Sequence, residues 1–431
     1  MRQSLASVIL LAAAALTVAG CSDYKARTAD ARQAFYSGDF ETAGKTYAQK
    51  RRGEDRDRLL YYLDAGMAFH AAGRRELSNK YLVKADDLIE ELNFSTGAGA
   101  QTAAVLTDDR ALPYVGEEFE AVLVNAVMAL NFLVAGGPRA PENALVECRR
   151  LDWKLREFAE LRKRPYLQNA FARYLSGVAF EMDREPNDAY IEYKLVHKLR
   201  PDFEPVRADL VRLAWRLGFR DDAEAWEKKF GIKFDRAVEN GTGEVVLVYQ
   251  CGRAPVKVQR DELLDLPVYK KLDYIERGAV LSAAGLPPVR TQTLEDVEAT
   301  AIKTLEDRMG PILARRAAKA AIKTAAAVGV HEAVKGSKKD RKEHPEREAL
   351  AIQAAVVTFQ LLNALDQADT RSWLTLPASF QVARMRLPVG AHTMVVEFQD
   401  AAGNPTGHRA EFAGVPVQPG RITVLTVRSL R

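Results

Sequence analysis

Six histidines and three cysteines give this 431-residue chain its most reactive side chains. The pair His331-Glu332 begins like a zinc-protease helix, in which two histidines four residues apart bind the metal. The position that needs the second histidine is Lys335, so the ligand pair is incomplete. The chain also lacks a Gly-x-Ser-x-Gly nucleophile turn and a complete Gly-x-x-x-x-Gly-Lys-Ser/Thr phosphate loop. We therefore expect a protein that is not an enzyme, with no metal site and no cofactor.

Cys148 is the one candidate nucleophile, because the neighbouring Arg149 would favour its thiolate. It also shares helical spacing with Leu145 and Leu151, which is typical of a cysteine packed in a core, and we predict the packed role. In an oxidising compartment Cys148 could pair with Cys251. Sequence alone does not show that the two are close enough, so two separate thiols are the prediction and the disulfide is the alternative.

The third cysteine, Cys21, follows a short basic start and an uncharged run from Ser4 to Val18. This is the pattern of a secretory signal, and the run is too short to span a bilayer comfortably. The sequence Val18-Ala19-Gly20-Cys21 resembles a lipobox, at which the cysteine receives a lipid and residues 1–20 are removed. We predict lipidation of Cys21; an ordinary signal with a chance cysteine is the alternative. Ser22 favours the outer membrane, with the protein on its periplasmic face.

Residues 21–236 are predicted to form an array of paired helices. Aromatic and small residues recur every three to four positions, and turns interrupt them at Gly38, Gly73, Gly136 and Gly218. The first two turns are 35 residues apart, which resembles the tetratricopeptide repeat with its period of about 34 residues. The series has four or five degenerate units. It loses its period in the middle, where residues 93–116 form an insertion rich in Gly, Ala, Thr and Asp.

Residues 237–431 are predicted to form a small antiparallel β-domain with an inserted helical hairpin at about 292–368. Glu244–Gln250 is a buried-strand run, and residues after 372 alternate in the strand manner with Gly and Pro turns. The fold class is therefore α+β, with the all-α array first. In the hairpin, Ala349 to Leu365 carries no charge, which raises the question of membrane insertion. Polar residues in this run and cations on the companion helix favour a soluble hairpin. A hairpin that lies on a membrane surface is the alternative.

The insertion contains the candidate partner contacts, Asp109 and Tyr114, because long loops in compact domains are often functional. A solvated turn is the alternative for the Asp108-Asp109-Arg110 cluster. The net charge is +4 at pH 7, which argues against a nucleic-acid-binding protein.

Four blocks carry a wider resemblance: Asn125–Asn131, Ala144–Arg150, Gly252–Lys257 and Asp369–Pro377. Together they resemble a family of Gram-negative lipoproteins that contain tetratricopeptide repeats. The resemblance implies a cell-wall context but transfers no catalytic residue.

The functional hypothesis is a lipid-anchored interaction scaffold of the cell envelope, whose groove binds envelope proteins, with cell-wall synthesis as one setting. One alternative is a periplasmic hydrolase whose acidic residues come from distant segments. Another is a structural subunit that self-associates through the hairpin.

Overall fold

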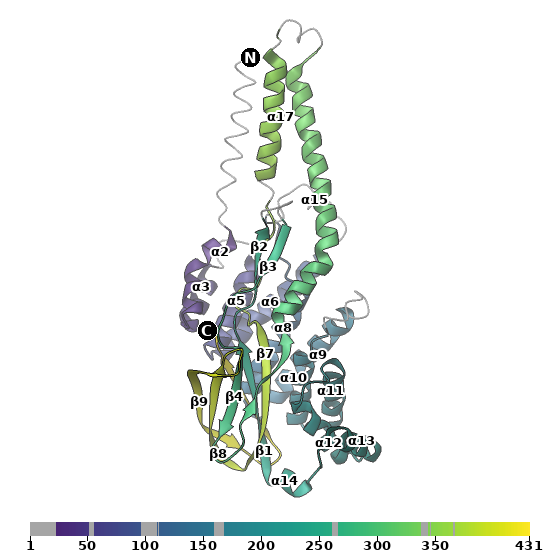
Figure 1. Cartoon of the computed structure of the whole chain (residues 1–431), viewed down its shortest axis with the longest axis vertical. Helices are drawn as coiled ribbons and strands as arrows, with labels where there is room; N and C mark the ends of the chain where they lie inside the picture. The colour runs from purple at the N-terminus through teal and green to yellow at the C-terminus, as the bar shows by residue number, and fades with distance from the viewer. Residues whose placement is uncertain are drawn as a thin grey trace.

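The computed structural model describes residues 23–50, 56–95, 110, 112–158, 168–260, 266–337, 344, 346–364 and 367–431. Cys21 and Asp109 lie outside these residues. The described chain is α+β, with a helical array followed by β-sheets, as the sequence predicts (Figure 1).

The array begins with the short helix α2 (Tyr24–Arg27) and continues as helical pairs. The pairs are α3 (Ala29–Tyr36) with α4 (Phe40–Lys50), α5 (Arg58–Ala71) with α6 (Arg75–Ser95), α8 (Glu118–Ala135) with α9 (Ala140–Arg156), α10 (Ala170–Met182) with α11 (Pro186–Leu199), and α12 (Pro205–Leu217) with α13 (Arg220–Phe230). The predicted boundary between residues 236 and 237 falls within the short helix α14 (Arg236–Asn240).

Small residues set the distance between the helices of a pair. A Cβ atom added to Gly177 on α10 would lie 2.3 Å from the ring of Tyr193 on α11, and one added to Gly66 would lie 2.6 Å from Leu82. The tyrosine and leucine side chains therefore pack directly on glycine backbone. This explains the glycine–aromatic spacing that the sequence repeats.

Helix α8 lies at the centre of the array. Among the described helices it alone has the length and composition to cross a membrane, but 78% of that stretch is buried inside the protein. It packs against α5, α6, α9, α10, β10 and α15. A helix that is apolar on all sides suits such a site, because every face meets another element.

Two four-stranded sheets follow the array. The first has the order β10-β1-β7-β6 and the second β5-β4-β8-β9, with a separate β2–β3 ribbon. The first sheet contains β1 (Thr242–Cys251), β6 (Gln292–Asp296), β7 (Ser379–Pro388) and β10 (Ile422–Arg428). The second contains β4 (Gly278–Ala283), β5 (Val289–Arg290), β8 (Gly390–Gln399) and β9 (Pro405–Val417), and the ribbon contains β2 (Val256–Arg260) and β3 (Leu266–Lys270).

The expectation of an antiparallel β-domain is wrong for one pair of strands. β1 and β10 are parallel, in a register that runs from Glu244 opposite Ile422 to Gln250 opposite Arg428. Parallel neighbours need a long crossover connection. The whole of the intervening chain supplies it here, so the local strand pattern gave no sign of this pairing.

The first sheet is the middle layer of a three-layer structure, between the helical array and the second sheet, and strand β1 shows this best. Val246 and Val248 belong to the core that the first sheet shares with the array, whereas Val245, Leu247 and Tyr249 belong to the core between the two sheets. Both faces of β1 are thus covered by apolar side chains. This accounts for its continuous apolar sequence, which lacks the alternation of a half-buried strand.

The inserted hairpin consists of α15 (Val297–Lys335) and α17 (Glu346–Ala364), which pack on each other. It leaves the sheet after β6 and returns to β7, the strand that pairs with β6. Figure 1 shows it projecting from the body along the long axis of the molecule. We call it the arm.

Candidate functional site

The inner side of the array is occupied by the chain itself. Residues 367–378, which we call the inner segment, connect the arm to β7. Trp373 is 1% exposed, and its backbone N–H donates to Glu120 Oε1 on α8 at 2.9 Å. Thr375 donates to Asp64 on α5 through its backbone N–H at 3.0 Å and its hydroxyl at 2.8 Å. The surface on which we expected a partner is therefore filled from within.

Burial changes the acidity of the two carboxyl groups that hold the inner segment. It raises the pKa of Asp64 to about 6, and burial together with the charge of Glu117 raises the pKa of Glu120 to about 7. Both groups keep several hydrogen bonds that favour the ionised form. Their role is to satisfy backbone donors of the inner segment.

Tyr114, a predicted partner contact, lies in this same interior. It is 4% exposed, and its hydroxyl donates to Glu120 Oε2 at 2.7 Å. The guanidinium of Arg371 lies over its ring, 5.5 Å from the centroid. The structure therefore gives Tyr114 a position between the array and the inner segment instead of a place on the surface, while Asp109 lies outside the described residues.

All four sequence blocks noted above contribute side chains to buried contacts. Asn125 donates to Asp86 at 3.1 Å and to Glu147 at 2.9 Å. Lys257 forms an ion pair with Glu117 at 2.7 Å, and the inner segment contains most of the block Asp369–Pro377. These contacts hold the array, the β2–β3 ribbon and the inner segment together.

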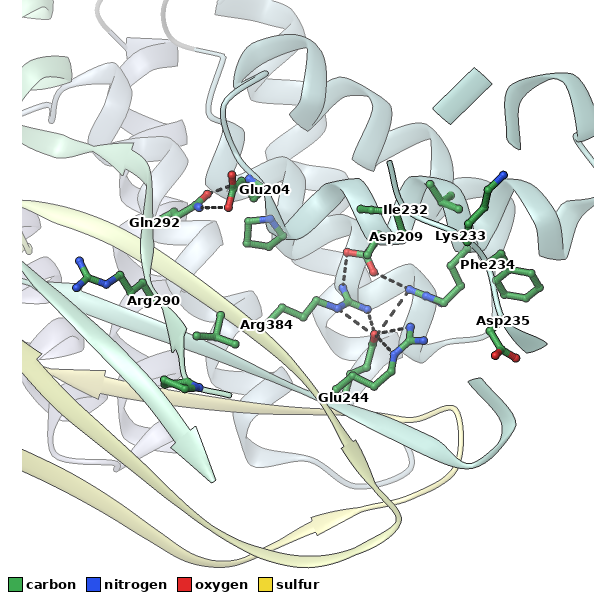
Figure 2. A pocket seen from close by; sticks show the side chains of 17 residues that line it. Glu204, Asp209, Ile232, Lys233, Phe234, Asp235, Glu244, Arg290, Gln292 and Arg384 are labelled. Carbon is green, nitrogen blue, oxygen red and sulfur yellow. Dashed lines mark hydrogen bonds and ion pairs between the residues drawn. The ribbon is translucent and has the colours of Figure 1, made fainter. Parts of the chain in front are cut away.

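An open cavity of about 530 Å³ lies between the last helical pair and the sheets. Its walls come from α12, the 232–235 loop after α13, the start of β1, β5 and β7, as Figure 2 shows. Ile232, Phe234, Pro288 and Val289 supply apolar surface, and Arg290 is an exposed cation of the lining. Local sequence patterns gave no sign of this cavity, because its lining comes from segments up to about 180 residues apart.

A buried network of ion pairs forms one side of the cavity. The side chain of Arg384 is 4% exposed; it lies 3.1 Å from Asp209 and 3.1 Å from Glu181, and it also pairs with Glu244. Arg212 lies 2.6 Å from Glu181 and 2.8 Å from Asp209. Ion pairs therefore connect α10, α12, β1 and β7. Figure 2 shows the part of the network that joins Asp209, Glu244 and Arg384.

The same network sets the protonation of its acids. Burial raises the pKa of Asp209 to about 6, against the opposing charges of Arg384 and Arg212. Burial would also raise the pKa of Glu244, but the charges of Arg384, Arg212 and Arg386 bring it well below its ordinary value. Each acid lining the cavity has a hydrogen-bond or ion-pair partner in the described chain, including Glu204 and Asp235. Among the described residues, the cavity therefore lacks a pair of carboxyl groups without such partners, which the hydrolase alternative would place here.

The two cysteines that the structure describes lie in the protein interior. Cys148 and Cys251 are both free and buried, and burial raises the pKa of the Cys148 thiol to about 12. A thiol with that pKa is a poor nucleophile at neutral pH. The described residues contain no group of three His, Cys, Asp or Glu side chains placed to hold a metal ion.

The arm carries the largest concentration of exposed apolar side chains. Of the seventeen large apolar residues that are exposed in the described chain, eight lie on α15 and α17. They are Leu313, Ile322, Val328, Leu350, Ile352, Val356, Val357 and Phe359. Concentrated apolar surface of this kind marks a contact with a protein or a membrane.

No protein-family model matches the sequence, and no curated protein matches it either. Solved structures give weak likenesses. A crystal structure of MamA is 15% identical over 46% of this chain and 91% of that chain, with a TM-score of 0.31. The apo form of RapI is 9% identical over 79% of this chain and 76% of that chain, with a TM-score of 0.35. At these scores the likenesses carry no argument about activity or partners.

Proposed function

We propose that this protein is an envelope lipoprotein that acts as a protein-interaction scaffold. Its residues 1–20 are removed, Cys21 carries the lipid, and the lipid holds the protein on the periplasmic face of the outer membrane. The lipobox-like sequence supports the anchor. A multiply acylated cysteine would hold the protein firmly, since burial of acyl chains contributes about 0.8 kcal/mol per CH₂ group.

The observation that carries the scaffold role is the open cavity at the end of the array. The inner side of the array is filled by residues 367–378, so a partner needs another surface. The cavity combines the apolar side chains of Phe234 and Val289 with the cation of Arg290, and the buried ion pairs hold its walls in place. This chemistry suits a partner segment with an apolar side chain and a neighbouring carboxylate.

Site-specific photo-crosslinking in cells tests this role. A photoreactive residue replaces Val289 in the cavity, and a matched control replaces the exposed Leu77 on α6. We expect a defined protein adduct from position 289 and none from position 77. The cell-wall context that the family resemblance implies makes cell-wall synthesis proteins the first candidates for the adduct. Equal adducts from both positions, or none from position 289, would refute a partner in the cavity.

The anchor is tested separately with Cys21→Ser. We expect the variant to lose acyl-group labelling, as mass spectrometry of the N-terminal peptide would show. Retention of the acyl group on the variant chain would show that Cys21 is not the lipidated residue.

A further inference from the structure

The apolar surface of α17 is too broad for the single helix that contacts it. Ala351 is buried, and Ala355 and Thr358 are half-buried, at the spacing of one helical stripe that packs on α15. The exposed apolar residues lie elsewhere: Leu350 and Val357 are seven positions apart, and Ile352, Val356 and Phe359 form a second row. From Ala349 to Ala364 the helix has no charged side chain.

The two exposed rows lie on the side of α17 away from the stripe that packs on α15. A lipid surface can cover such a side along its whole length, because it surrounds every side chain that enters it. A second copy of the chain could cover it as well, and contact between copies is an outcome of the test below.

The position of the arm supports lipid as the occupant. Helix α2 is fixed to the body, because Tyr24 donates to Asp64 at 2.7 Å and Lys25 donates to the backbone oxygen of Lys257 on β2. β2 pairs with β3, and β3 contacts α15. Helix α2, which Asp23 precedes, therefore lies at the end of the body from which the arm projects (Figure 1). Cys21 is two residues away, a reach of about 7 Å.

Charged residues at the tip of the arm favour one orientation of the arm relative to the membrane. Glu332, Lys335, Glu346 and Arg347 are charged and lie where the two helices end. Carrying such charges through the hydrocarbon core costs several kcal/mol. An arm that lies along the membrane surface keeps them in water and places the apolar rows of α17 among the headgroups. Its helix of 19 residues covers about 28 Å of that surface.

We propose that the arm is a second membrane attachment, which lies in the interface of the phospholipid bilayer that holds the lipid on Cys21. This inference rests on the proposed lipid anchor. The lipid chain and the arm would fix the body in one orientation.

An environment-sensitive fluorophore on Val356→Cys tests the contact. The protein is the mature chain with Cys21→Ser, and the buried Cys148 and Cys251 leave the new thiol as the reactive one. Vesicles of phosphatidylethanolamine and phosphatidylglycerol should shift the emission to the blue. The matched control, a fluorophore on Val238→Cys in α14, should not respond, although Val238 is about as exposed as Val356.

A second measurement keeps the test decisive if the unlipidated chain binds too weakly. The lipidated protein is reconstituted into vesicles that carry a lipid-borne quencher, and we expect quenching at position 356 but not at 238. In the Cys21→Ser chain, Ile352→Glu/Val356→Glu/Val357→Glu should lower vesicle binding at least tenfold, whereas Val146→Glu/Ile191→Glu/Val238→Glu should leave it unchanged.

The outcomes separate the arm from the lipid anchor. An unquenched probe at position 356 in membrane-bound, lipidated protein overturns the proposal. So does a blue shift without vesicles that grows with protein concentration, because it shows contact between copies of the chain. Mass spectrometry of Cys21 reports the acyl group independently, and absence of the acyl group would refute the proposed anchor. The vesicle test of the Cys21→Ser chain would still show whether the arm binds a membrane.

Discussion

Helices α8 and α17 have similar lengths and apolar sequences, yet they lie in opposite surroundings. α8 meets packed elements on every face, whereas α17 is covered along one stripe by α15 and is otherwise exposed. Apolarity on all sides therefore shows that a helix must be surrounded, but not by what. For α8 the protein supplies the surroundings; for α17 we propose that a membrane does.

The strongest test of this contrast is a charge placed on each helix. Val127 on α8 is fully buried and Val357 on α17 is 58% exposed. Val127→Asp should lower the free energy of unfolding by about 4 kcal/mol or more, because an unpaired carboxylate enters the core. Val357→Asp should change it by less than about 0.5 kcal/mol. Urea denaturation followed by circular dichroism measures both, and a large loss from Val357→Asp would show that α17 is covered by protein.

The inner segment provides the next largest effect. Trp373→Ala should cost about 3–5 kcal/mol of unfolding free energy, since it empties a site in the core that the array shares with the sheet. Trp153, which is 62% exposed on α9, is the matched control, and Trp153→Ala should cost little. Equal effects in urea denaturation would mean that the inner segment does not secure the array.

Because of Glu295, at the base of the arm, we expect the stability of the folded protein to depend on pH. Burial raises its pKa to about 7 in the folded protein, so the folded chain binds the proton more tightly than the unfolded chain. Its contribution to stability is then full below the unfolded pKa and is lost as the pH rises to about 7. From pH 4 to pH 8, wild type should lose roughly 3 kcal/mol relative to Glu295→Gln. The exposed Glu332, whose pKa Lys335 holds below its ordinary value, is the control: Glu332→Gln should still show the loss.

The smallest effects come from two glycines in helices. Gly177→Ala should destabilise the protein by about 1–3 kcal/mol, because the new methyl group meets the buried ring of Tyr193. Gly329→Ala on α15 should stabilise it by about 0.5–1 kcal/mol, since nothing lies within 4 Å of the new Cβ and alanine favours the helix. Thermal melts report both signs, and a loss at position 329 would indicate that the arm packs against something there.

Local sequence periodicity predicted the helical pairs, the run that forms β1 and the inserted arm. It failed where distant segments meet. Arg384 and Arg386 look like the solvated face of a strand, but Arg384 is buried by acids from α10, α12 and β1. The apolar residues Trp373, Leu374 and Leu376 were a usable signal, because a connection this apolar needs burial. Nothing in the local pattern identified the helices that bury it.

The parallel pairing of β1 with β10 has a consequence for biosynthesis. Both neighbours of β1 in the sheet, β7 and β10, are synthesised after the arm, and β10 follows β1 by roughly 180 residues. At 5–20 residues per second, the ribosome needs roughly 10–35 s to supply that last neighbour. Throughout this interval the most apolar strand of the first sheet has an open edge. A chain that is exported must therefore be kept unfolded until β10 is available, and factors that shield nascent chains should act on it between residues 251 and 422.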